Sequence, residues 1–281
     1  MIGAAATQET LGEREYRAIR DRIYARASIW FPPAKMALIA SRLQRRLRAL
    51  NMSTYAEYLR LALADFAEET RMLECLCTHE TSFFREPQHF ELLQRHVLPR
   101  WKIDGENGAR QRKVRALSAG CSSGEEPFSI AMMLADALPG WTTEVVAGDV
   151  SPRILEKAAR AEWPIDRALQ IPDALRRRYM MRGVGENAGV MRATADLRAL
   201  VRFQEFNLGA AAHAGVGKFD LIFCRNVLIY FDPQSKERAV RGLLSHLAPG
   251  GLFFVGHAES LSGFGASLET LIPTVYRSKP S

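Results

Sequence analysis

The chain has 281 residues, of which 47% are hydrophobic and 25% are charged, so it is long enough to bury a substantial core in one large domain or in a large and a small one. Its four cysteines lack the spacing of a disulfide framework, and no apolar run reaches the length of a secretory signal or a membrane span. This excludes disulfide-rich secreted proteins and predicts a protein of the reducing cytoplasm that does not insert into a membrane.

The net charge of +7 is concentrated at the N-terminus. The first 50 residues contain ten Lys or Arg and four Asp or Glu, which leaves the rest of the chain almost neutral. The asymmetry predicts an acidic partner for this segment, which could be a nucleic acid, an anionic membrane face or a carboxylate-rich protein helix.

Up to about residue 80 the pattern is helical, because apolar residues recur three and four positions apart. Pro32-Pro33 separates the first helix from the second, and Ser53 can cap a third. The second helix has an apolar face and an adjoining arc of four cations, Lys35, Arg42, Arg45 and Arg46. No acid interrupts that arc, which favours a binding surface over a merely solvated face.

Three potential metal ligands, Cys75, Cys77 and His79, follow one another in this region at alternate positions. No second pair of ligands follows them, as a structural zinc site would require. We interpret them as packing residues and expect no metal.

From about residue 113 strands and helices alternate. A helix is predicted from Pro87 to about Trp101, ahead of this alternation. The alternating segments are strands at 113–119, 143–149, 219–224 and 252–256, and helices at 126–138, from Ser151 onward, and at 233–247. This order predicts an α/β fold with a parallel sheet covered by helices on both faces, in which ligands bind at the carboxyl ends of the strands.

A turn of small residues, Gly120-Cys-Ser-Ser-Gly-Glu-Glu126, joins the first strand to its helix. We expect Gly120 and Gly124 to remove Cβ atoms where a ligand approaches the backbone. The next strand ends in Asp149, at the place where nucleotide-binding folds hold a ribose diol. Glu125 and Glu126 would repel a pyrophosphate but suit an ammonium or a sulfonium, so the pattern favours S-adenosylmethionine over a plain strand-to-helix turn with a charged helix start.

Two further clusters accompany this turn. The strand at 219–224 leads into Arg225, Asn226 and Tyr230, without the Pro-Pro pair expected of an adenine or cytosine amino-methyltransferase. The segment Thr78-His-Glu-Thr-Ser-Phe-Phe-Arg-Glu86 lies at the junction of the two halves and reads either as a linker anchor or as a source of ligand contacts. Residues 176–208 break the alternation, with short strand-like pieces at 190–192 and 200–206, and predict a small antiparallel insertion that either selects a partner or only covers a sheet edge.

Taken together, these motifs resemble the CheR-type chemotaxis receptor methyltransferases, which esterify receptor glutamates with S-adenosylmethionine. The resemblance covers nearly the whole chain and includes, besides the segments quoted above, Ser41–Leu50, Gly148–Ala158, Phe206–Leu208, Cys224–Asp232 and Gly256–Ser260. It implies a class I methyltransferase sheet at 81–281, with a linker helix at about 87–101 and the β insertion at 176–208, preceded by a helical domain at 1–80.

The resemblance also implies roles for individual residues. Arg85 and Tyr230 would be the active-site pair, and Lys35, Arg42, Arg45 and Arg46 would face receptor carboxylates. The cofactor pocket would be lined by Thr81, Arg85, Glu126, Asp149, Asn207, Leu208, Arg225 and Asn226. Many members have Asn where this chain has His79, whose imidazole can still donate one hydrogen bond.

The implied partner is a cytoplasmic methylation helix of a chemoreceptor, bound by a monomeric enzyme. In some members the insertion docks a receptor C-terminal pentapeptide, and whether this chain does so stays open. A nucleic-acid methyltransferase and a cofactor-binding scaffold without activity are the alternatives. The absent Pro-Pro pair argues against the first, and the presence of Arg85, Asp149 and Tyr230 against the second.

Overall fold

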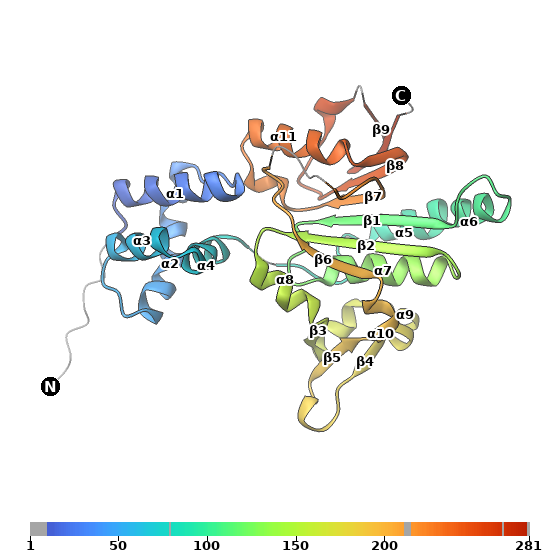
Figure 1. Ribbon diagram of the computed structural model, residues 1–281, viewed down its shortest axis with the longest axis horizontal. Helices are drawn as coiled ribbons and strands as arrows, with labels where there is room; N and C mark the ends of the chain where they lie inside the picture. The colour runs from blue at the N-terminus through green and yellow to red at the C-terminus, as the bar shows by residue number, and fades with distance from the viewer. Residues whose placement is uncertain (1–9, 79, 211–214, 266, 280–281) are drawn as a thin grey trace. The chain divides into compact units, whose positions relative to one another are not determined.

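The computed structural model describes residues 10–78, 80–210, 215–265 and 267–279, and the chain forms two compact units (Figure 1). The first unit comprises Met1–His79 together with Tyr230–Ser235, and the second comprises Glu80–Ile229 with Lys236–Ser281. No helix within these described ranges is long and apolar enough to cross a bilayer.

The first unit is built from helices. They are α1 (Glu13–Ala27), the 3₁₀ turn η1 (Pro33–Lys35), α2 (Met36–Ala49), α3 (Tyr55–Ala64) and α4 (Phe66–Leu76). The predicted break at Pro32-Pro33 is confirmed. The predicted cap of the third helix is wrong by one residue. Thr54, not Ser53, accepts a hydrogen bond from the Glu57 N–H and donates its own N–H to the Glu57 carboxylate, which is a capping box.

The segment 230–235 belongs to the helical unit because of its backbone contacts. Ile29 forms an antiparallel bridge with Phe231, and the Trp30 N–H donates to the Tyr230 carbonyl at 2.8 Å. The Tyr24 hydroxyl lies 3.0 Å from the buried Ser235 hydroxyl. The backbone of Tyr230 is therefore fixed by the loop that follows α1.

The second unit contains a seven-stranded sheet in the order β6-β2-β1-β7-β8-β10-β9. Its strands are β1 (Lys113–Ala119), β2 (Thr142–Asp149), β6 (Val201–Glu205), β7 (Phe219–Cys224), β8 (Leu247–Val255), β9 (Leu268–Ile272) and β10 (Val275–Ser278). The first five are parallel, whereas β10 runs antiparallel to both its neighbours. The carboxyl ends of β2, β1, β7 and β8 therefore meet along one edge.

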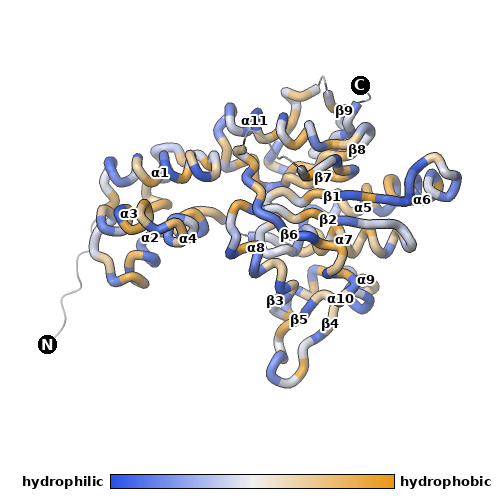
Figure 2. The backbone as a smooth tube through the Cα atoms, in the orientation of Figure 1, coloured by the Kyte–Doolittle hydropathy of each residue, from blue (hydrophilic) through white to orange (hydrophobic). Residues whose placement is uncertain are grey.

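Both faces of this sheet are covered. Ala116 to Ala119 of β1 and Leu221 to Cys224 of β7 are buried at every position, and successive side chains of a strand point to opposite faces. The helices of this unit include α5 (Pro87–Leu92), α6 (Leu98–Glu106), α7 (Glu125–Ala137), α8 (Pro152–Ala159) and α11 (Pro233–Leu244, which begins in the 230–235 segment). Figure 2 shows hydrophobic residues along the middle of the strands and hydrophilic ones in the chain that leads into β1. The predicted α/β class is confirmed.

The helix predicted at 87–101 is longer than expected. α5 continues through the π-helical turn η2 (Leu93–Val97) into α6, which ends at Glu106. The residues Ile103–Glu106, beyond the predicted end of this helix, complete the last turn of α6.

The predicted insertion is partly wrong. A three-stranded antiparallel sheet does form, from β3 (Glu162–Pro164), β5 (Val190–Ala193) and β4 (Met180–Arg182), with α9 (Asp173–Tyr179) and α10 (Ala195–Arg198) beside it. However, the piece at 200–206 belongs to the main sheet as β6, parallel to β2. A short alternating strand carries the same sequence signal in either sheet, so only the pairing distinguishes them.

Candidate functional site

The turn from β1 to α7 is held in a left-handed conformation at two glycines. Gly120 has φ +83° and Gly124 has φ +95°. A Cβ on Gly120 would lie 2.5 Å from Cγ2 of Val227, and one on Gly124 would lie 3.2 Å from Cβ of Ala158. Positive φ and the packing against Val227 and Ala158 are thus sufficient reasons for glycine at both positions, and the approach of a ligand to this backbone stays a prediction.

Asp149 lies at the carboxyl end of β2 and is 7% exposed. Its Oδ2 accepts a hydrogen bond from the Ser122 N–H at 3.0 Å, and its Oδ1 accepts one from the Ser151 N–H at 3.2 Å. Ser151 also caps α8, as predicted, through its hydroxyl. The β1–α7 turn and the start of α8 thus orient one carboxylate at the sheet edge.

Glu126 occupies the first turn of α7, beside the end of β1. The Ser118 hydroxyl donates to its Oε1 at 2.7 Å, and Nη1 of Arg225 lies 3.5 Å from its Oε2. Burial raises the pKa of Glu126, and the attraction of Arg225 and the hydrogen bond from Ser118 do not fully oppose this. A cation next to this carboxylate would therefore be stabilised.

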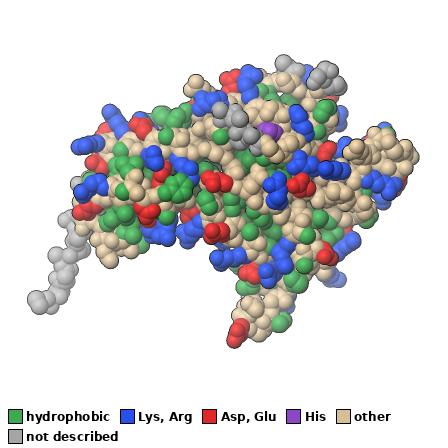
Figure 3. Space-filling view, in the orientation of Figure 1, with side chains coloured by type: hydrophobic (Ala, Val, Ile, Leu, Met, Phe, Trp, Pro, Cys, Tyr) green, Lys and Arg blue, Asp and Glu red, His purple; other side chains and the backbone are tan. Residues whose placement is uncertain are grey.

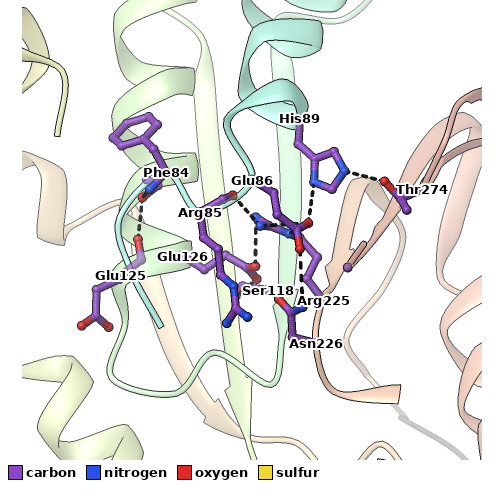
Figure 4. Close-up of polar contacts among 12 residues, drawn as sticks. Phe84, Arg85, Glu86, His89, Ser118, Glu125, Glu126, Arg225, Asn226 and Thr274 are labelled. Atoms are coloured by element: carbon purple, nitrogen blue, oxygen red, sulfur yellow. Dashed lines mark hydrogen bonds and ion pairs between the residues drawn. The ribbon is translucent and has the colours of Figure 1, made fainter. Parts of the chain in front are cut away.

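Arg225, directly after β7, lies at the centre of the polar cluster in Figure 4. Its side chain is 1% exposed, and its guanidinium contacts Glu86 at 3.2 Å as well as Glu126. It also donates to the carbonyl of Arg85. One buried guanidinium thus serves two carboxylates from different elements and holds the backbone of the segment that carries Arg85.

The neighbours of Arg225 have perturbed pKa values. Burial acts to raise the pKa of Glu86, but Arg225 and the N–H of His257, which donates to Glu86 at 3.1 Å, outweigh it, so the pKa is lowered. Burial, aided by Arg225, lowers the pKa of His89 to about 4. At neutral pH the cluster therefore holds an ionised Glu86 and an uncharged His89.

Arg85 is a charged side chain near Glu126, whose pKa its charge acts to lower, but it is not in salt-bridge contact with a described carboxylate. Its Nη1 donates to the carbonyl of Glu80 at 2.9 Å, and it forms no ion pair with a residue that the structure describes. The side chain extends away from Arg225 in Figure 4. The segment that leads into it is anchored at two points, because the Thr81 carbonyl accepts from Arg167 at 3.1 Å and the Phe84 N–H donates to the Ser129 hydroxyl at 3.0 Å.

Three further predicted residues lie in the same unit. Asn226 adopts a left-handed φ of +59°, and its Nδ2 is 3.4 Å from Oε1 of Glu86. Asn207 and Leu208 follow β6, where the Asn207 carboxamide accepts from the Gly209 N–H at 3.0 Å and Leu208 is buried. The structure thus brings Arg85, Glu126, Arg225 and Asn226 into one cluster around Glu86.

Other predicted site residues lie elsewhere. His79 is outside the described residues. Tyr230 and the four predicted cations, Lys35 of η1 and Arg42, Arg45 and Arg46 of α2, belong to the helical unit. Of those cations, Arg46 forms an ion pair of 2.5 Å with Glu68 of α4, and Arg42 donates to the Leu76 carbonyl and to the Thr78 hydroxyl at 2.7 Å. Lys35 and Arg45 are exposed.

Sequence reasoning missed Glu86, Ser118 and Glu259 as parts of this cluster. Glu86 and Glu259 end or fall within segments that carried the family resemblance, and Ser118 precedes the glycine turn. Their presence in those segments was a signal, but their partners lie between 8 and 140 residues away in the chain.

Comparison with known families matches both units. The "CheR methyltransferase, all-alpha domain" model covers residues 14–77, and the "CheR methyltransferase, SAM binding domain" model covers 79–276. The chain belongs to the CheR methyltransferase family. It is an S-adenosylmethionine-dependent methyltransferase with a class I, Rossmann-like sheet.

Relatives of this CheR family member extend over almost the full chain. "Chemotaxis protein methyltransferase 2" of Pseudomonas aeruginosa is 37% identical, with 93% of this chain and 92% of the relative covered. "Chemotaxis protein methyltransferase" of Escherichia coli is also 37% identical, over 95% and 91%. Among solved structures, the glycopeptide N-methyltransferase MtfA complexed with sinefungin is 17% identical with a TM-score of 0.34, over 66% of this chain and 59% of its own.

The residues at the sheet edge fit the family's cofactor. Asp149 is oriented by two N–H groups at the position that holds a ribose diol in this class of fold. Glu126 is a largely buried acid that a positive charge would stabilise, and Nη1 of Arg225 is buried 3.5 Å from it without a hydrogen bond to any described residue. A ligand that carries a ribose diol, a positive charge and a carboxylate would find a partner for each of these groups.

Proposed function

We propose that the enzyme methylates glutamate side chains of chemoreceptors and so forms γ-glutamyl methyl esters that tune adaptation. The observation that carries the proposal is Arg85. Its backbone is held by the buried Arg225, whereas its own guanidinium has no carboxylate partner among the described residues. A cation held this way on a methyltransferase sheet suits an acidic substrate group. The printed names of the relatives, chemotaxis protein methyltransferases, support the same substrate class.

The reaction requires orientation rather than a base. A glutamate side chain has an unperturbed pKa of about 4.3, so the attacking carboxylate is already ionised at neutral pH. S-adenosylmethionine, when bound, supplies a methyl group on a positively charged sulfur. Arg85 orients the substrate carboxylate and Tyr230 helps to hold the reacting groups in line. Alignment of this kind is worth up to roughly 7–11 kcal/mol in favourable systems.

Cofactor binding is assigned to residues along the sheet edge. Asp149 holds the ribose, and the backbone of Asn207 and Leu208 contacts the adenine. Thr81, Glu126, Arg225 and Asn226, with Arg85 and His79, bind the methionine part. The functional division then lies near residue 80, with the cofactor and the chemistry in the C-terminal part and the receptor contact in the helical part.

The helical domain is proposed to bind the acidic face of a receptor methylation helix. Arg42 and Arg46 form hydrogen bonds and an ion pair within the helical unit, so of the four predicted cations Lys35, at the end of η1, and Arg45, on α2, are the ones exposed for the receptor. We place the enzyme in the cytoplasm as a monomer. On the face in Figure 3 basic and acidic side chains are interspersed, which gives no support to a nucleic-acid partner.

The test is a transfer assay with labelled S-adenosylmethionine and receptor cytoplasmic fragments. The expected product releases its label as methanol on base treatment, because an ester hydrolyses and an N-methyl group does not. Arg85→Ala should abolish most of this transfer even at saturating S-adenosylmethionine, and Arg100→Ala on α6 serves as an exposed control. Base-stable label, or a single-turnover rate that follows a side-chain titration between about pH 7 and 9, would contradict the proposal.

A further inference from the structure

Glu259 is a buried carboxylate that accepts hydrogen bonds from three backbone N–H groups. It is 4% exposed and lies four residues after the end of β8. Its Oε2 accepts from the Asn226 N–H at 2.8 Å and from the Gly256 N–H at 2.6 Å, and its Oε1 accepts from the Ile229 N–H at 3.2 Å. Among the described residues, no side chain forms a hydrogen bond or an ion pair with the Glu259 carboxylate.

These hydrogen bonds join the carboxyl ends of two adjacent strands. Asn226 and Ile229 belong to the turn that leaves β7, and Gly256 follows β8, which is paired with β7. The two ends are in close contact, because a Cβ on Gly256 would lie 2.5 Å from Nδ2 of Asn226. Asn226 has positive φ, so its N–H depends on this acceptor rather than on a regular sheet or helix partner.

The turn held by Glu259 carries predicted site residues at both ends. Asn226 begins it, and Tyr230 follows Ile229 directly in the chain and ends the 3₁₀ turn η5 (Leu228–Tyr230). Asn226 is held a second time, by Glu86. Ile229, the residue before Tyr230, is held within the second unit by its hydrogen bond to Glu259.

We propose that Glu259 is a positioning residue for the methyl transfer, which acts by setting the turn that leads into Tyr230. The inference rests on the role assigned to Tyr230 in the proposed function. Glu259 itself takes no part in the reaction. It fixes the residue before Tyr230, and a displacement of about 1 Å in an aligned group can lower a rate by roughly a hundredfold.

The test is a double-mutant cycle in the full chain, with Glu259→Gln and Tyr230→Phe. Glutamine has the shape of glutamate but turns an NH₂ group toward at least one of the three N–H donors, so the turn must shift. Glu259→Gln should lower kcat by roughly tenfold to a hundredfold, with a smaller change in the Kd of S-adenosylhomocysteine, since Asn226 keeps its contact with Glu86. In the Tyr230→Phe background the same change should alter kcat by less than about threefold. Glu269→Gln, on an exposed β9 residue paired with Arg277 at 3.7 Å, is the control and should leave kcat unchanged.

The outcomes separate this inference from the proposed function. If Tyr230→Phe leaves kcat unchanged, the role of Tyr230 fails. If Tyr230→Phe lowers kcat but Glu259→Gln lowers it by the same factor in both backgrounds, the positioning role of Glu259 is overturned. A merely structural role would lower the melting temperature and kcat and would raise the Kd of S-adenosylhomocysteine at the same time. Should the glutamine variant fold poorly, Glu259→Asp keeps the charge and shortens the reach, and the same cycle applies.

Discussion

Both units bury carboxylates against arginines, but with different numbers of partners. In the helical unit Glu68 pairs with Arg46 at 2.5 Å and Glu69 pairs with Arg22 at 2.7 Å, so each acid has its own cation. At the sheet edge a single guanidinium, that of Arg225, serves both Glu86 and Glu126. In a one-to-one pair the arginine neutralises the charge of its carboxylate, and the pair has a structural role. A cation shared by two carboxylates leaves one negative charge for a ligand to neutralise.

The largest effect is expected when the shared cation is removed. Arg225→Met leaves an unsatisfied Arg85 carbonyl and two carboxylates whose side chains are only 10% and 14% exposed, which should lower the free energy of unfolding by about 3–5 kcal/mol. Arg46→Met removes the cation of a one-to-one pair and should cost less, because the side chain of Arg46 is 18% exposed and water can reach the site. Urea denaturation followed by circular dichroism measures both. Equal losses would show that sharing the cation has no energetic consequence.

Acid should destabilise the cofactor-binding unit through His89. Its pKa of about 4 in the folded state lies below the ordinary 6.5, so the unfolded chain takes up the proton first as pH falls. Stability is then lost progressively below about pH 6.5. The loss at pH 5.5 should be about 1.4 kcal/mol. The lowered pKa of Glu86 contributes only below about pH 4.5, outside this range.

Urea midpoints at pH 7 and pH 5.5 would measure this loss. His89→Gln should reduce the difference between the two midpoints, whereas His96→Gln, at an exposed position of η2, should not. An unchanged pH dependence in the His89 variant would assign the acid sensitivity to other groups.

The order of elements could be predicted from the sequence because it depends on local patterns. The strands at 113–119 and 219–224 have the predicted bounds, and the Ser151 cap follows from residue type and position. Pairings between distant segments could not be predicted in this way. The same alternating signal placed β6 in the wrong sheet, and nothing near Arg46 in the chain indicates Glu68.

The candidate site shows the same limit. Asp149 and Glu126 stand out because each follows or opens an element at the sheet edge. Glu86 and Glu259 do not, because their importance comes from hydrogen bonds to residues brought near by the fold, such as Asn226. A turn motif in the sequence predicts the backbone conformation of the turn. It does not predict which acceptor binds the N–H groups of that turn.

The smallest effect is expected at an exposed cation of α2. It tests the comparison between arginines that are paired with a carboxylate and arginines that are free to bind a partner. Arg45→Glu reverses a charge that no described carboxylate neutralises, so stability should change by less than about 0.5 kcal/mol. An exposed charge contact is worth about 0.2–1 kcal/mol, so KM for the receptor fragment should rise by roughly two- to fivefold at low salt, and the difference should shrink as salt is added. Arg46→Met is the matched variant from the same helix. It should lower stability without this salt-dependent change in KM, because its cation is already committed to Glu68. If the two variants instead raise KM equally, the receptor must compete for the Arg46 pair, and α2 acts as one undivided basic surface.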